Sequence, residues 1–293
     1  MNISDIDLTE NDLKKIIENY FYKTHKQINV KYKINKLLIE KITRNGFLGD
    51  YYSLTIFLSI KKVSYEKFFF KNYISLFIKR LPSDNSYLNG FNVFTKEINI
   101  YKNLLPRLVY INDNSHNNFI TNHYLTKNDE LIVFDNLKEL NYKLFINEKS
   151  KYLFDYEHLS LTLKVISRLH AASLILEFRT KQKVYEMYKN CLVENAYPKD
   201  PSNVRVIGFN NAVSVHCEFI KNIDKYKNLS NINEIITKFI EIMNQVYDYV
   251  LMSEVYQNVV IHGDLWCNNI MFKYDDHRDD DEHKEGNLIY FFK

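Results

Sequence analysis

The stretch VVIHGDLWCNNIMF, residues 259–272, places a short polar segment between two apolar runs. Short apolar runs rich in β-branched residues are typical of buried strands, and the polar residues between them predict a loop. Strands on both sides would anchor such a loop and hold its side chains in one geometry, as a functional site requires. Asp264 and Asn269 are the loop residues that we expect to face one point. A polar turn between two buried strands is the alternative interpretation.

The spacing of the polar side chains favours a functional loop. His262, Asp264 and Asn269 follow the pattern H-x-D-x-x-x-x-N, which is that of kinase catalytic loops. In that chemistry the Asp receives the proton of the attacking hydroxyl, and the Asn binds a Mg²⁺ ion that bridges the nucleotide phosphates. The pattern therefore predicts a phosphotransferase with Asp264 as the catalytic base and Asn269 as a metal ligand.

The composition is that of a globular protein. The chain has 293 residues, of which 46% are hydrophobic, and this length suffices for one large domain or two lobes. We find no apolar run of about 18 residues and no secretory signal in the polar N-terminus, so we expect no membrane span and no secretion. Three separated cysteines predict neither a disulfide framework nor a zinc site and fit the cytoplasm. A net charge of +3 gives no reason to expect nucleic acid or a membrane as partner.

The first part of the chain is expected to form a helix and an antiparallel sheet. Thr9, with an acid three residues later, predicts a capped helix start. Strand-like patterns follow at 29–43 and 52–63. Gly46 and Gly49 lie between these strands, where glycine lets the backbone approach a nucleotide phosphate. Their spacing is not G-x-G-x-x-G, so an ordinary hairpin turn is the alternative.

A lysine and a glutamate predict a buried ion pair. Lys79 lies near the end of an apolar strand at 71–82, and ammonium groups are rarely left unpaired in a core. Glu97 lies in the segment 93–106, whose apolar spacing predicts a helix that ends before Pro106. A strand Lys paired with a helix Glu positions the α- and β-phosphates of ATP in kinases. A surface Lys and a solvated Glu are the alternative.

A change in character of the sequence predicts the boundary between two lobes. Two more strands are expected near 119–124 and 130–134. Asp135 then begins the predicted connection, where the backbone meets the adenine edge of the nucleotide in this interpretation. We therefore divide the chain into an N-lobe, residues 1–135, and a partial C-lobe, residues 136–293.

The C-terminal half is mainly helical by pattern. Residues 157–178 predict an amphipathic helix, and residues 231–252 predict another helix. The apolar side of the first helix is expected to consist of Leu159, Leu163, Ile166, Leu169 and Leu176. His170 is interpreted as a core residue rather than a base. The acidic tract after Phe272 is interpreted as a solvated hairpin rather than a metal site.

Together these motifs resemble the ecdysteroid kinase-like family of insect small-molecule kinases. The segments that carry the resemblance stand in the family's order and are LFIKRLP at 76–82, VFTKEINIYKNLLP at 93–106, SRLHAAS at 167–173 and HGDLWCNNIMFKYD at 262–275. The resemblance implies an α+β, two-lobed protein-kinase-like fold, with ATP and Mg²⁺ as cofactors. It also implies transfer of the γ-phosphate to a hydroxyl of a small molecule, such as an ecdysteroid or a xenobiotic. Lys79 and Glu97 would hold phosphates, Asp264 would be the base and Asn269 a metal ligand.

The end of the chain departs from the family pattern. The family's last strand resembles L-I-D-F-Q, whose Asp is a second Mg²⁺ ligand, whereas this chain has LIYFF with Tyr290 at that position. A phenol supplies neither the charge nor the bidentate oxygens that Mg²⁺ prefers. The alternative is therefore a catalytically impaired, pseudokinase-like binding protein or a C-terminally truncated gene product. A protein Ser/Thr kinase is less favoured, because Gly263 stands where such kinases have Arg. The sequence leaves the acceptor and the oligomeric state open.

Overall fold

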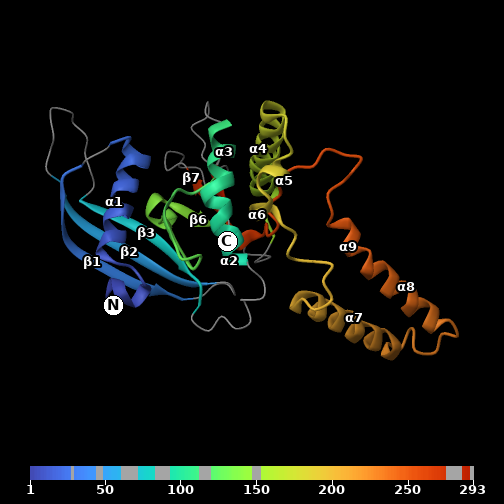
Figure 1. The fold of residues 1–293 in the computed structure, drawn as a ribbon. Helices are drawn as coiled ribbons and strands as arrows, with labels where there is room; N and C mark the ends of the chain where they lie inside the picture. Colours follow the sequence, from blue (N-terminus) through green and yellow to red (C-terminus); the bar gives the residue numbers. More distant parts are fainter. Residues whose placement is uncertain are drawn as a thin grey trace. The chain divides into compact units, whose positions relative to one another are not determined.

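The larger sheet of the structure has five antiparallel strands in the order β1-β2-β3-β5-β4 (Figure 1). They are β1 (Tyr32–Ile42), β2 (Asp50–Ile60), β3 (Tyr73–Arg80), β4 (His123–Lys127) and β5 (Leu131–Asp135). The structure is a computed structural model that describes residues 1–27, 30–43, 49–60, 72–82, 93–111, 120–146, 153–274 and 286–290. The predicted antiparallel sheet is confirmed, although β4 begins later than the sequence pattern indicated.

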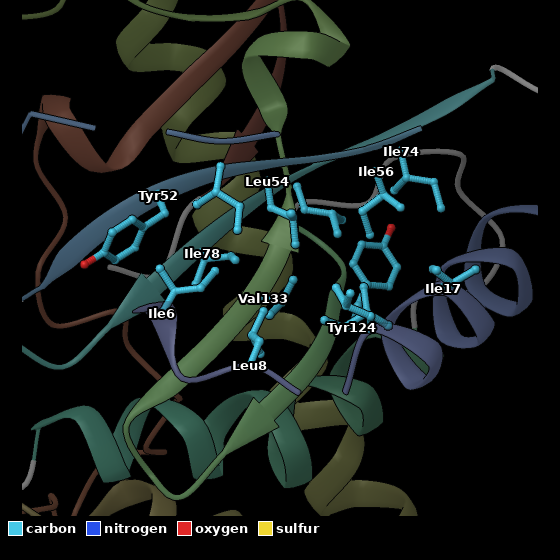
Figure 2. Close-up of a cluster of buried hydrophobic side chains, with 14 of the residues drawn as sticks. Ile6, Leu8, Ile17, Tyr52, Leu54, Ile56, Ile74, Ile78, Tyr124 and Val133 are labelled. Carbon is cyan, nitrogen blue, oxygen red and sulfur yellow. The ribbon is translucent and has the colours of Figure 1, made fainter. Parts of the chain in front are cut away.

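An N-terminal helix covers one face of this sheet. The short 3-10 helix η1 (Ile3–Ile6) precedes α1 (Glu10–His25). Thr9 caps α1 as predicted, because its hydroxyl accepts from Asp12 N–H at 3.2 Å while Asp12 Oδ2 accepts from Thr9 N–H at 2.9 Å. Figure 2 shows side chains of α1, β2, β3, β4 and β5 meeting in one cluster, which is the main hydrophobic core. Each fully buried aliphatic side chain there contributes about 1.5–3 kcal/mol to stability.

Strand alternation places the predicted lysine on the other face of the sheet. Ile74, Leu76 and Ile78 of β3 point into the main core and are almost fully buried. Because neighbouring residues of a strand point to opposite faces, Lys79 lies on the face away from α1. Its partner across the ladder is Tyr51 on β2.

The helical segment that follows does not end before Pro106, and that prediction is wrong. It comprises α2 (Val93–Asn99), the π-helix η3 (Ile100–Leu104) and α3 (Leu105–Ile111). Proline lacks an N–H and clashes with the preceding helical turn. The wider π-turn before it changes the hydrogen-bond pattern, with Leu105 N–H bonding Ile100 O, so the chain continues through Pro106 as the second residue of α3.

A smaller sheet contains the C-terminal end of the segment 259–272. It has the order β6-β7-β8, with β6 (Tyr142–Leu144), β7 (Ile270–Tyr274) and β8 (Gly286–Tyr290). Both pairings are antiparallel. Two 3-10 helices, η4 (Leu137–Leu140) and η5 (Cys267–Asn269), precede β6 and β7 respectively. The acidic tract interpreted as a hairpin lies outside the described residues.

The long helix α4 (Tyr156–Thr180) is present as predicted, but its buried side differs. Leu159 and Leu163 are 46% and 55% exposed. The buried face instead includes polar residues and consists of His158, Thr162, Val165, Leu169, Ala172, Ser173 and Leu176. By length and composition α4 alone, among the described helices, is able to cross a membrane. Core helices of globular proteins can have the same length and composition, so this finding by itself does not indicate a membrane span.

The chain divides into two compact units. The first comprises Met1–Ser83, Phe94–Cys191 and Val259–Lys293, and the second comprises Asp84–Val93 and Leu192–Asn258. The first unit also contains two short helices, α5 (Val184–Met187) and α6 (Lys189–Leu192), the latter at its edge. The predicted lobe boundary at residue 135 stays a prediction.

The second unit is helical and has a small core. Its helices are α7 (Val204–Asn222), α8 (Ile232–Asn244) and α9 (Val246–Tyr249). Val213, Cys217 and Ile236 are its buried cluster. A single helix over 231–252 was predicted, but it stops at Asn244, where Gln245 N–H bonds Ile242 O in a tighter turn.

Antiparallel sheets with packed helices form an α+β arrangement, compatible with the kinase-like fold that the resemblance implied.

Candidate active site

The loop at 262–264 turns at a glycine. Gly263 has φ +83°, in the left-handed region that side chains with a Cβ rarely adopt. This turn brings Asp264 N–H to 3.1 Å from His262 Nδ1, which accepts the hydrogen bond. Glycine at this position is therefore a requirement of the loop geometry. The side chain of Asp264 is exposed, as a group that meets a substrate must be.

Asn269 is fixed against Asp264 from the end of η5. Its side chain is only 1% exposed. The amide Nδ2 donates to Asp264 O at 2.8 Å and to Asp264 Oδ2 at 2.9 Å. The Asn269 backbone N–H donates to Trp266 O at 2.9 Å. The two residues selected by their spacing in the sequence are thus in direct contact.

The oxygen of the Asn269 amide, Oδ1, is buried and accepts no hydrogen bond among the residues that the structure describes. Both Nδ2 contacts are to acceptors, so the amide cannot be turned around without losing them. A buried unsatisfied carbonyl costs about 1–3 kcal/mol and calls for a function or a bound ion. An amide oxygen beside a carboxylate is a suitable donor set for Mg²⁺, which binds oxygen ligands.

The segment before the loop is held by α4 and not by a strand. A strand at 259–261 was predicted, and the structure shows none there, which corrects the prediction. Val260 N–H instead donates to Ser173 Oγ at 3.2 Å, and Ser173 Oγ donates to His170 O at 2.7 Å. A side chain of α4 thus replaces the neighbouring strand. The predicted strand on the other side of the loop is β7, which is confirmed.

Lys79 and Glu97 form the predicted ion pair. Lys79 Nζ donates to Glu97 Oε2, and the two residues are 2% and 6% exposed. The ammonium also lies 5.3 Å from the centroid of the Phe94 ring, close enough for a cation–π contact. The surface alternative for this pair is excluded, because both side chains are buried.

Gly49 lies beside this pair. A Cβ added to Gly49 would come within 3.3 Å of Lys79 Cγ and 3.1 Å of Tyr51 Cε1. A larger residue would therefore press on the stem of the lysine. Gly46, the other glycine predicted to contact the nucleotide, lies outside the described residues.

Asp135 is buried in a separate hydrogen-bond network. Its carboxylate accepts from Tyr124 Oη at 2.5 Å and from Asn122 Nδ2 at 3.0 Å, and its N–H donates to Asn122 O at 3.1 Å. Burial raises the pKa of Asp135, although these hydrogen bonds and Lys23 oppose the rise. The carboxylate and the backbone N–H of Asp135 are thus hydrogen-bonded within the sheet. The predicted adenine contact would therefore depend on the backbone carbonyl of Asp135.

The backbone of residue 290 lies next to the loop. In the ladder of β7 and β8, Tyr290 pairs with Ile270, the residue that follows Asn269. This register places the backbone of position 290 opposite the residue that follows the candidate metal ligand. The role of position 290 as the second metal position stays a prediction.

Long-range contacts are the part of the site that the sequence did not indicate. Ser173 stands 87 residues before Val260 and carries no spacing signal that connects the two. Ala172 and Ser173 of the SRLHAAS motif are both buried. The hydrogen bond of Ser173 to the loop is the additional finding.

These features define a class of protein. A buried Lys–Glu pair between sheet and helix, together with an H-x-D-x-x-x-x-N loop, is the arrangement of kinase-like phosphotransferases. Residues 49–289 match the model of the ecdysteroid kinase-like family. The chain therefore belongs to the ecdysteroid kinase-like family, and the match includes all four residues of the two pairs. Searches of the curated proteins and of the solved structures returned no match.

Proposed function

We propose that this protein transfers the γ-phosphate of ATP, with Mg²⁺, to a hydroxyl of a small molecule. Asp264 accepts the proton of that hydroxyl as it attacks. Asn269 Oδ1 is a ligand for the metal, which when bound neutralises charge on the transferring phosphates. Lys79, oriented by Glu97, binds the α- and β-phosphates.

The observation that carries this proposal is the geometry of Asn269. Its Nδ2 is used by Asp264, and its buried Oδ1 is left without a partner among the described residues. The same contacts hold Asp264, the proposed base, and Asn269, the proposed metal ligand, together before nucleotide or metal binds. Such preorganisation is what phosphoryl transfer depends on, because positioning and electrostatics supply most of its catalysis.

The ion pair supports the nucleotide part of the proposal. A buried ammonium is costly unless it is paired, and replacing such a pair by apolar residues often leaves stability unchanged or improves it. Retention of Lys79 and Glu97 inside the protein is therefore better explained by ligand binding than by stability. The adjacent Gly49 leaves the lysine stem room.

The acceptor in this proposal is a hydroxylated, mainly apolar small molecule of the ecdysteroid or xenobiotic type. The family description names ecdysteroid kinases, and this is the support for the substrate class. The same match does not favour the alternative of an impaired binding protein.

Titration calorimetry with ATP, with and without Mg²⁺, tests the proposal on the purified chain. We expect binding that requires Mg²⁺ and is lost or strongly weakened in Asn269→Leu, which has a similar volume but no oxygen. Transfer of labelled γ-phosphate to a panel of polyhydroxylated steroids and xenobiotic alcohols then identifies the acceptor. Glu254→Gln, a change of an exposed acid outside the site, is the matched control.

Two results would contradict the proposal. One is ATP binding that is equal with and without Mg²⁺. The other is a folded Asn269→Leu variant that binds Mg·ATP as tightly as the unaltered chain.

A further inference from the structure

A hydrogen-bonded chain centred on the buried His158 connects the N-terminal end of α4 to the last residue of β7. Asp155 Oδ1 accepts from His158 N–H at 2.9 Å and lies 2.6 Å from His158 Nδ1. On the other side of the imidazole, His158 Nε2 lies 3.0 Å from Tyr274 Oη. Asp155 and Tyr274 are 119 residues apart in the sequence, so this chain closes a long loop. None of the three belongs to the pairs described above.

Aromatic rings enclose the imidazole. The His158 ring centroid is 3.8 Å from that of Phe145 and 4.6 Å from that of Phe272. Phe154 packs edge-on against Phe272 at 5.5 Å. Apolar walls of this kind strengthen hydrogen bonds and leave the ring one orientation. Its two nitrogens are therefore directed at two fixed partners.

The chemistry of Asp155 fixes the direction of one of the two hydrogen bonds. A carboxylate only accepts hydrogen bonds, so His158 Nδ1 carries a hydrogen and donates to Asp155. The second hydrogen bond joins His158 Nε2 to the Tyr274 hydroxyl, which can either donate or accept. Removal of the Tyr274 hydroxyl breaks the chain at β7 and leaves His158 bonded to Asp155 alone within the chain.

The chain ends on the strand that follows the candidate metal ligand. β7 begins at Ile270, directly after Asn269, and ends at Tyr274. Its ladder with β6 has three paired positions, between 142–144 and 271–273, and its ladder with β8 has five, between 270–274 and 286–290. These ladders hold the backbone of β7, and side-chain bonds at its two ends supplement them. The bond of Tyr274 to His158 holds the far end of β7, and the bonds of Asn269 to Asp264 hold the near end.

We propose that His158 and Tyr274 are positioning residues for Asn269. Held through β7, the Asn269 carbonyl keeps the place from which it binds the metal, and without the Tyr274 hydroxyl it moves in a wider range. This inference rests on the proposed function for its effect on Mg²⁺. Its structural part, a stiffer loop at 264–269, does not depend on that function.

Tyr274→Phe removes one hydroxyl and keeps the ring, and Thr162→Val is the matched control. Thr162 Oγ1 donates to His158 O at 2.7 Å in the same turn of α4. For Tyr274→Phe we expect the Mg²⁺ concentration that half-saturates ATP binding to rise about 3–10-fold, below the range for direct supports of metal ligands. ATP affinity at saturating Mg²⁺ should change less than about twofold. For Thr162→Val both values should stay near those of the unaltered chain.

Amide hydrogen exchange supplies the readout that is independent of metal binding. The Asn269 amide, bonded to Trp266 O, should exchange faster in Tyr274→Phe than in Thr162→Val. His158→Phe should have at least the effect of Tyr274→Phe, because it also removes the bond to Asp155. The double variant should add nothing to His158→Phe, because the bond to Tyr274 is already lost in it.

The outcomes separate the two proposals. If the unaltered chain shows no Mg²⁺-dependent ATP binding but Tyr274→Phe still accelerates exchange at Asn269, positioning stands and the proposed function fails. If binding is Mg²⁺-dependent, yet Tyr274→Phe and Thr162→Val give the same Mg²⁺ midpoint, the positioning role is overturned. Equal exchange at Asn269 in these two variants overturns it as well.

Discussion

Lys79 and Glu97 meet between a strand and a helix, whereas Asp264 and Asn269 meet inside one loop. The first pair consists of two opposite charges, both buried, and the attraction between them offsets the free-energy cost of removing each from water. The second pair joins an exposed carboxylate to a buried amide, and one amide oxygen has no partner in the described part of the chain. The two pairs thus show two ways of holding polar groups in place. One is the attraction of buried opposite charges, and the other is hydrogen bonding within a loop.

The difference predicts how each pair connects stability with function. A group in the first pair cannot be changed without disturbing the buried face of the sheet. A group in the second pair, held by local side-chain and backbone bonds, can be changed with little effect on folding. Substitutions in the two pairs should therefore separate loss of activity from loss of stability.

The largest effect is expected for Lys79→Met. It leaves the buried Glu97 carboxylate without its ammonium partner, which typically costs about 3–5 kcal/mol, and removes the proposed phosphate ligand. Urea unfolding and Mg·ATP titration measure the two losses. The double variant Lys79→Met with Glu97→Leu should recover most of the stability and none of the ATP binding. A single variant as stable as the unaltered chain would show that the pair carries no such coupling.

Asp264→Asn should slow phosphate transfer strongly and leave folding intact. The new side chain keeps an oxygen for Asn269 Nδ2 but cannot accept the hydroxyl proton, so transfer should slow by about 10²–10⁴-fold. Because Asp264 is exposed, the free energy of unfolding should change by less than about 0.5 kcal/mol. Single-turnover transfer and urea unfolding test both statements. Loss of folding equal to that of Lys79→Met would remove the contrast between the pairs.

Ser173→Ala tests the support of the loop from α4. It leaves Val260 N–H, now bonded to Ser173 Oγ, without that acceptor in a buried place, which costs about 1–3 kcal/mol. Ser167→Ala is the matched control in the same motif, because Ser167 is exposed and bonds Lys164 O; its cost should stay below about 0.5 kcal/mol. Thermal unfolding of the two variants makes the comparison. Equal costs would mean that the Val260 bond contributes nothing.

Local signals in the sequence predicted the parts of the molecule that are built from local contacts. The capping box of Thr9 joins residues three apart, and the contact of Asp264 with Asn269 joins residues five apart. Spacing alone carries such information. The Lys79–Glu97 pair was also predicted, because a charge on a buried strand requires a counter-charge nearby in the chain.

Contacts between distant segments were beyond the sequence pattern. The apolar residues of α4 predicted only part of its buried face, since Leu169 and Leu176 are buried but Leu159 and Leu163 are exposed. The rest of that face includes His158, Thr162 and Ser173, which are polar yet satisfied by bonds inside the protein. A pattern of hydrophobicity cannot show which polar residues have buried partners. The absent strand at 259–261 has the same origin, since the sequence did not reveal that α4 supplies its hydrogen-bond partner.

The smallest effect concerns a histidine in the sheet that carries the first pair. Burial, with further contributions from Lys23 and Lys102, lowers the pKa of His123 from 6.5 to about 4. The unfolded chain therefore binds a proton at His123 below about pH 6.5, while the folded chain does not until about pH 4. Stability is unaffected by this group above that window and falls as the pH drops through it, by on the order of 1–2 kcal/mol at pH 5.

Urea unfolding at pH 7 and pH 5 tests this expectation with His123→Gln. The variant has no proton to take up, so its stability should fall less between the two pH values than that of the unaltered chain. His216→Gln, at an exposed site in the second unit, is the control and should keep the full loss. If His123→Gln and His216→Gln lose equal stability between pH 7 and pH 5, the buried histidine is not a source of acid sensitivity. Asp135 would not account for the loss, because burial raises its pKa and such a carboxyl stabilises the folded chain as the pH falls. The next group to substitute would be Asp12, whose hydrogen bonds to Thr9 outweigh burial and lower its pKa.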